Sequence, residues 1–82
     1  MTARFTMYST PWCGYCHRLG RQLDGEGLDF DVVDIEREPA AADIVARVND
    51  GNLTVPTLVF ADGTALTNPS IAEVHAQLAL SA

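Results

Sequence analysis

Hydrophobic and polar positions along the first half of the chain switch between a period of two residues and a helical period. Residues 4–9 alternate in character and predict a short strand, and residues 30–35 predict a second one. Between them, residues from about 14 to 23 follow a helical period, and Gly25 and Gly27 signal its end. The inward positions of this helix are Cys16, Leu19, Gly20 and Leu23.

The second half of the chain predicts a helix, a hairpin and a final helix. Pro39 opens the helix at a position where its missing N–H does no harm, and residues 49–52 stop it. Strands at 57–60 and 64–66 flank Asp62–Gly63, a strong hairpin signal. The final helix opens at residues 68–70. The expected inward positions of the two helices are Ala41, Ile44, Val45 and Val48, and then Ile71, Val74, His75 and Leu78.

The predicted order of elements is β-α-β-α-β-β-α, an α/β fold with four strands and three helices. The first two strands are joined by a helix and should therefore be parallel, whereas the last two should pair as a hairpin. The 82 residues are expected to form one domain, 1–82, because the chain is short and no linker, repeat or low-complexity tract divides it.

Charge and hydropathy narrow the possible partners. The formal net charge is −6, which repels nucleic acid and anionic membrane surfaces. No stretch approaches the roughly 20 apolar residues of a membrane span, and residues 1–10 lack the apolar run of a signal peptide. We therefore expect a cytoplasmic protein that binds neither nucleic acid nor membranes. It should be monomeric, because no extra apolar surface is evident.

Candidate chemistry concentrates in Cys13-Gly14-Tyr15-Cys16, which follows a strand and opens a helix. The free N–H groups and the partial positive charge at a helix start favour a thiolate at Cys13. Cys16 lies one helical turn later, on the inward face and within disulfide reach. We predict that Cys13 is the exposed nucleophile of a disulfide-exchange reaction and that Cys16 is the buried resolving thiol.

Two other interpretations of the cysteine pair stay open at this point. A zinc site usually needs four ligands, and the chain offers only His17 and His75 besides the cysteines. A purely structural disulfide would be unusual in a reducing compartment. Redox chemistry therefore fits the pair better than either, and we expect no metal.

Two features near the cysteines are candidates for a binding groove. Trp12 and Tyr15 flank the thiols, and amphipathic rings favour binding surfaces. Val55–Pro56 precedes a strand, and a cis peptide there would expose the backbone of Val55 towards the thiols. That backbone could then pair with the peptide-like part of a substrate.

The segment 67–71 is a third candidate. Ser70 and Glu73 have the spacing of a capping box, so a helix cap is expected there. The same N–H groups could in addition hold a polar ligand.

These motifs together resemble the glutaredoxins, and more closely the mycoredoxins, their actinobacterial branch. The segments that carry the resemblance are Trp12–Cys16, Val48–Asn52, Thr54–Pro56, Ala61–Gly63 and Thr67–Ser70. The resemblance covers nearly the whole chain. It implies a minimal thioredoxin fold, in which three helices flank a four-stranded mixed sheet.

The resemblance also implies a cofactor and a mechanism. Mycoredoxins use mycothiol, a cysteinyl glucosaminyl-inositol thiol, where other organisms use glutathione. The expected substrates are mycothiolated proteins, reduced by a monothiol reaction of Cys13 that does not need Cys16. An NADPH-dependent flavoenzyme would reduce the mycothiol disulfide that forms. The expected groove residues are Trp12, Tyr15, Val55, Pro56, Thr67, Asn68 and Ser70.

Departures from the glutathione-type pattern favour mycothiol. Glutaredoxins commonly carry a Lys or Arg just before the Cys-x-x-Cys, where this chain has residues 9–11, Ser-Thr-Pro. Thr67–Asn68 replaces the usual Gly-Gly. Glutathione carries two carboxylates and mycothiol none, so a groove without cations suits mycothiol, whose sugar needs hydrogen-bonding groups and an aromatic edge. Leu53, where many glutaredoxins have a basic residue, discriminates weakly because mycoredoxins vary there.

Two rival functions stay open. The first is a redoxin reduced by thioredoxin reductase, a class that typically carries a Trp-Ser-Gly-Phe-type segment where this chain has residues 67–70. The second is a protein that bridges an iron–sulfur cluster between two monomers. Gly14 permits the close backbone approach that such bridging needs, and Cys13 would be the protein ligand.

Overall fold

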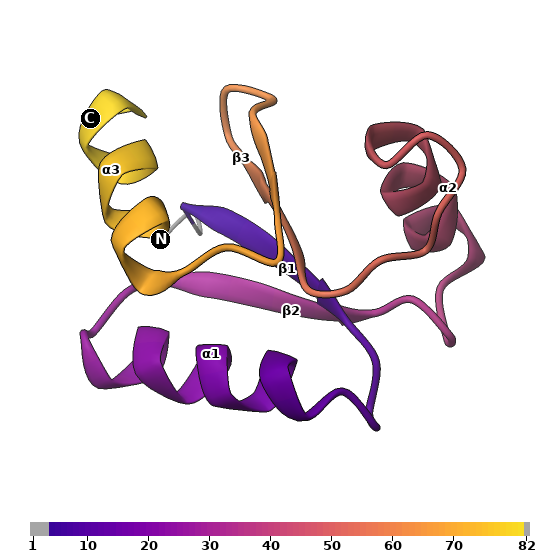
Figure 1. The fold of residues 1–82 in the computed structure, drawn as a ribbon, viewed down its shortest axis with the longest axis horizontal. Helices are drawn as coiled ribbons and strands as arrows, with labels where there is room; N and C mark the ends of the chain where they lie inside the picture. Colours follow the sequence, from indigo (N-terminus) through magenta and orange to yellow (C-terminus); the bar gives the residue numbers. More distant parts are fainter. Residues whose placement is uncertain (1–3, 82) are drawn as a thin grey trace.

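The computed structural model describes residues 4–81 and contains the predicted elements in the predicted order (Figure 1). They are β1 Phe5–Ser9, α1 Gly14–Gly25, β2 Phe30–Asp34, α2 Pro39–Val48, β3 Thr57–Phe60, β4 Ala65–Thr67 and α3 Ile71–Ser81. Residues 1–3 and 82 lie outside the described residues. They belong to the expected domain 1–82, and residues 1–3 are also part of the segment 1–10 that is expected to lack a signal peptide.

The four strands form one mixed sheet in the order β2-β1-β3-β4. β1 is parallel to β2 and antiparallel to β3, and β3 and β4 form the hairpin, as predicted. Phe5 stands in register with Phe30 on one side and Phe60 on the other. The three rings lie with centroids 5.3 and 5.1 Å apart, so aromatic contacts help to fix the register.

Helices cover both faces of the sheet. Alternate residues of β1 point to opposite faces, and Phe5 and Met7 pack in one apolar cluster while Tyr8 packs in another. The first cluster includes side chains of α1 and α3, and the second includes Ala41 and Val45 of α2. Figure 1 accordingly shows α2 well apart from α1 and α3. The active-site loop 10–13 links β1 to α1 at one end of this sandwich.

Two residues predicted to face the core do not. Val48 is 42% exposed, because α2 ends there and Asn49, one position further, makes the contact with β3. The His75 side chain is 52% exposed and pairs with Glu26 at the end of α1. α3 packs through Val74 and Leu78, so position 75 lies at the edge of the buried face.

The hairpin differs from the prediction by one residue. Thr64 belongs to the turn, where its carbonyl accepts from the Phe60 N–H at 2.8 Å and its own N–H donates to Asp62 Oδ1 at 3.0 Å. Gly63 has φ of 90°, which favours glycine at that position. β4 therefore runs from Ala65 to Thr67, and Thr67 is part of the sheet rather than of a loop.

Among residues 4–81, no helix combines the length and the apolar character needed to cross a membrane.

Candidate active site

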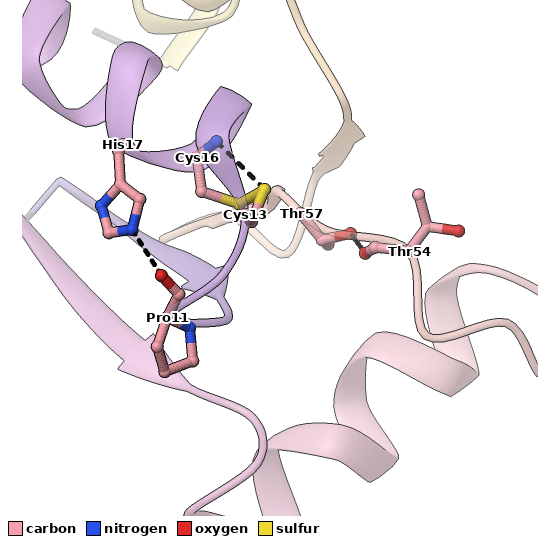
Figure 2. Close-up of a disulfide and its surroundings, with 6 residues drawn as sticks. All are labelled: Pro11, Cys13, Cys16, His17, Thr54 and Thr57. Carbon is pink, nitrogen blue, oxygen red and sulfur yellow. Dashed lines mark hydrogen bonds between the residues drawn. A yellow bond between two sulfur atoms is a disulfide. The ribbon is translucent and has the colours of Figure 1, made fainter.

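Cys13 is both a redox-capable residue and the N-cap of α1. It has extended backbone angles, φ −82° and ψ 103°, and its Sγ accepts the N–H of Cys16 at 3.1 Å. The helix start thus directs a backbone donor at the sulfur, an arrangement that stabilises negative charge there. In the structure Cys13 and Cys16 are joined by a disulfide, with Cα atoms 5.3 Å apart (Figure 2).

The two cysteines differ less in exposure than predicted. Cys16 is 2% exposed, as expected of a residue on the inner face of α1, but Cys13 is only 8% exposed. In the disulfide form, the Cys13 sulfur is bonded to Cys16 in the first turn of α1 and accepts the N–H of the same residue. The Cys13 N–H also donates to the Thr10 carbonyl at 3.2 Å, and this tight turn further closes the loop.

Both histidines have partners other than the cysteines. His17 Nε2 lies 2.7 Å from the Pro11 carbonyl, and since a carbonyl can only accept, Nε2 carries the proton (Figure 2). This bond ties the active-site loop to the first turn of α1. His75 pairs with Glu26. Within residues 4–81, no cluster of three or more His, Cys, Asp or Glu side chains is arranged to hold a metal ion.

Three of the predicted groove segments meet one another. The Val55–Pro56 peptide is cis, and the Pro56 carbonyl accepts the Asn68 N–H at 2.8 Å. The Tyr15 hydroxyl, one residue before Cys16, donates to the Pro69 carbonyl at 2.9 Å. The segment 67–70 is therefore hydrogen-bonded both to the loop that precedes β3 and to the Cys-x-x-Cys helix.

Two hydroxyl groups in this segment have structural partners. Ser70 and Glu73 form the predicted capping box, in which Ser70 Oγ accepts the Glu73 N–H and Glu73 Oε1 accepts the Ser70 N–H. Thr67 Oγ1 donates to Asn49 Oδ1 at 2.6 Å. Ser70 keeps its hydroxyl proton and Thr67 keeps free lone pairs for a ligand.

Trp12 is 72% exposed, yet its indole N–H donates to Glu36 Oε2 at 2.9 Å. No local signal predicts a contact between residues 24 positions apart, so this role of Glu36 could not be found from the sequence. The side-chain hydrogen bonds of Asn49 to β3 and β4 were also not predicted, although Asn49 lies in the Val48–Asn52 motif. Positions 9–11 carry no charge and Glu36 adds a negative one, so this side of the site has no cation from these residues.

Disulfide exchange needs an attacking sulfur that is stabilised as a thiolate and a second sulfur within bonding reach. The sheet and α1 together place both at the end of β1, beside a cis-proline loop. Fold and site thus define a thiol–disulfide oxidoreductase with the thioredoxin fold.

Comparison with known proteins narrows this class. The glutaredoxin family model matches residues 5–65, and the chain belongs to the glutaredoxin family. It is 55% identical to a Mycobacterium tuberculosis protein named as a glutaredoxin, over 95% of this chain and 93% of the relative. It is 45% identical to Mycoredoxin 1 of Corynebacterium glutamicum, over 89% of this chain and 90% of that protein. The glutaredoxin from Methanosarcina mazei Go1 has a TM-score of 0.80 at 26% identity, covering 93% of this chain and 78% of its own. This chain is a glutaredoxin-like disulfide oxidoreductase.

Proposed function

We propose that this protein reduces mixed disulfides between proteins and mycothiol, with mycothiol as its thiol cofactor. The observation that carries the proposal is the composition of the groove beside Cys13. Residues 9–11 and 67–68 carry no cation, and the exposed Thr67 and Asn68 offer a hydroxyl and an amide, which suits a sugar-containing thiol without carboxylates. The 45% identity to Mycoredoxin 1 supports the same cofactor.

The first step is an exchange at Cys13. The reduced Cys13 thiolate attacks the mycothiol sulfur of the mixed disulfide, forming a Cys13–mycothiol disulfide. The bond between the mycothiol and protein sulfurs breaks, and the target protein leaves as a thiolate that takes a proton from water. The Cys16 N–H, which already donates to the Cys13 sulfur at 3.1 Å, helps to keep that sulfur anionic before the attack.

The second step regenerates the enzyme. The thiolate of a second mycothiol attacks the mycothiol sulfur held on Cys13, so that mycothiol disulfide forms and Cys13 leaves as a thiolate. Over the two steps one free mycothiol is consumed and the target sulfur is reduced to a thiol, while the mycothiol from the mixed disulfide and the second mycothiol leave joined as mycothiol disulfide. A separate NADPH-dependent reductase would return the mycothiol disulfide to two thiols. Cys16 takes no part on this route, although it can form the disulfide with Cys13 seen in the structure.

The groove residues have distinct roles in this scheme. Trp12 forms one wall, and the backbone of Val55, next to the cis bond to Pro56, pairs with the cysteinyl amide of the ligand. Tyr15, Thr67, Asn68 and Ser70 form the other side, where the sugar hydroxyls would bind. We place the protein in the cytoplasm as a monomer and a single domain, acting on mycothiolated proteins without a metal.

A coupled turnover assay with a mixed-disulfide substrate tests the proposal. One arm contains mycothiol, its disulfide reductase and NADPH, and the other contains glutathione with its own reductase. We expect turnover with mycothiol at least tenfold faster than with glutathione. Preferential turnover with glutathione would overturn the cofactor assignment. Turnover with thioredoxin reductase and NADPH alone would instead identify a thioredoxin-reductase-dependent redoxin.

A further inference from the structure

The side chain of Asn49 lies at the end of α2 and makes three hydrogen bonds inside the protein, which use both of its amide protons and one lone pair of its oxygen. Its Nδ2 donates to the Val45 carbonyl at 3.0 Å and to Thr57 Oγ1 at 3.1 Å. Its Oδ1 accepts the Thr67 hydroxyl at 2.6 Å. One amide thus connects α2 to β3 and to the end of β4.

The contact with Thr57 continues into the cis-proline loop. Thr57 follows Pro56 directly and is 0% exposed. Its hydroxyl donates its single proton to the Thr54 carbonyl at 2.8 Å (Figure 2). It must therefore accept from Asn49. A directed chain of hydrogen bonds therefore runs from Asn49 through Thr57 to Thr54, at the entrance to the cis peptide.

The contact with Thr67 reaches the other side of the groove. Thr67 stands directly opposite Thr57 in the β3–β4 ladder. It precedes Asn68, whose N–H donates to the Pro56 carbonyl. The two backbone segments proposed to contact the thiol cofactor are thus linked both directly and through the Asn49 amide.

We propose that Asn49 is a positioning residue of the thiol-binding groove. It holds the segments 54–56 and 67–68 at the separation that the cofactor requires, without touching the cofactor itself. This inference rests on the proposed function, because it takes those segments as the cofactor site. The Asn49–Thr67 hydrogen bond also joins the segments 48–52 and 67–70, two of the segments that carry the family resemblance.

The direction of the Thr67 hydrogen bond has a consequence for the ligand. Because its proton is committed to Asn49, the exposed Thr67 hydroxyl presents only lone pairs to the groove. It can accept a hydrogen bond but not donate one. A ligand rich in hydroxyl donors, such as a sugar or an inositol ring, matches that acceptor. Asn49 therefore sets the polarity of the groove as well as its width.

Steady-state kinetics of Asn49→Ala test the inference, with Asn52→Ala as the matched control. Asn52 lies in the same loop, but its amide donates only to the Asn49 carbonyl and reaches neither strand. Asn49→Ala should raise the KM for the thiol cofactor about five- to tenfold, the effect of losing roughly one net hydrogen bond, and change kcat less than about twofold. Asn52→Ala should change neither. The rate of Cys13 alkylation by iodoacetamide should match the wild type in both variants.

Variants of Thr67 distinguish a positioning role of Asn49 from a general loss of stability. Thr67→Val removes the hydroxyl, and Thr67→Ser keeps it. Thr67→Val should raise KM, whereas Thr67→Ser should restore it to near the wild-type value. Since either substitution alone removes the Asn49–Thr67 hydrogen bond, the KM increase of the double variant should be smaller than the product of the increases of Asn49→Ala and Thr67→Val. If Asn49→Ala does not fold, Asn49→Asp replaces it, because Asp keeps the acceptor for Thr67 and loses the donor to Thr57.

The outcomes distinguish this inference from the proposed function. Each variant is compared with the wild type using whichever thiol, mycothiol or glutathione, gives wild-type turnover. A wild type that works only with glutathione overturns the proposed function, while a KM effect of Asn49→Ala in that assay upholds the positioning role. A lower melting temperature with an unchanged KM would show a merely structural residue and overturn the inference. A wild type that turns over neither thiol overturns both.

Discussion

The indole N–H of Trp12 donates to the carboxylate of Glu36 at 2.9 Å, although the Trp12 side chain is mostly exposed to solvent. Glu36 is in turn placed by its own N–H, which donates to Asp34 Oδ1 at the end of β2. The Trp12 ring, which we propose as a wall of the groove beside Cys13, is therefore held by the turn that follows β2. An exposed ring held in this way is already oriented for binding and loses little freedom when a ligand arrives.

Replacing Glu36 should release the Trp12 ring. Trp12 is the single tryptophan of the chain, so the tryptophan fluorescence reports on this ring alone. Glu36→Ala should increase fast depolarisation in time-resolved anisotropy and raise KM about two- to threefold, the size of a weak exposed hydrogen bond. Glu36→Gln keeps an acceptor oxygen and should behave like the wild type in anisotropy. Identical anisotropy decays for Glu36→Ala and the wild type would show that the bond does not restrain the ring.

The two cysteines should differ sharply in their contribution to turnover. Cys13→Ser removes the sulfur that attacks and should reduce turnover at least about a thousandfold, as loss of a covalent nucleophile does. Cys16→Ser should retain most of it, because the monothiol route never uses Cys16. The coupled mixed-disulfide assay measures both. Loss of activity in Cys16→Ser as well would show a dithiol mechanism and contradict the monothiol scheme.

Tyr15→Phe should destabilise the protein modestly. The change removes the hydroxyl that donates to the Pro69 carbonyl and leaves that acceptor without this partner. The expected loss is about 0.5–1.5 kcal/mol in the free energy of unfolding, measured by urea denaturation with an unchanged m-value. A variant as stable as the wild type would mean that water replaces the hydroxyl at no cost, and Tyr15 would then not contribute to holding segment 67–70.

The capping box at the start of α3 should be measurable apart from ligand binding. Ser70→Ala removes the acceptor of the Glu73 N–H and should cost about 1 kcal/mol of stability. Ser70→Thr keeps a capping oxygen and should cost much less. Denaturation curves of the two variants give this comparison. Equal losses in both would indicate that the capping oxygen is not the source of the effect.

Core packing should dominate single-site stability in a domain of this size. Leu23 is fully buried between the sheet and the helices on one face, whereas Leu80 is 82% exposed on α3. Leu23→Ala should lose about 2–5 kcal/mol, and Leu80→Ala should stay within about 0.5 kcal/mol of the wild type. Thermal or chemical denaturation checks both, and Leu80→Ala serves as the control for the substitution itself.

Sequence reasoning predicted most of the fold because its signals are local. The helical spacing of Leu19 and Leu23, the proline that opens α2 and the Asp62–Gly63 turn each specify backbone conformation within a few residues. The thiol chemistry could also be predicted from the sequence, because Cys13 and Cys16 lie within one helical turn of each other. Val48 and His75 were wrongly predicted to face the core. Helical periodicity indicates which side of a helix is apolar, but not how far the neighbouring layer extends along it.

The arrangement of the residues that we propose as the groove could not be predicted without the tertiary structure. The contacts of Trp12 with Glu36, of Tyr15 with Pro69 and of Asn49 with Thr67 join residues 24, 54 and 18 positions apart. The sequence by itself determined the order of elements, the reactive pair and the capping residues, because propensity, spacing and turn chemistry act over short distances. Only the folded sheet decided which polar groups face one another across the site, because these hydrogen bonds depend on the pairing of β1 with β2 and β3 and of β3 with β4.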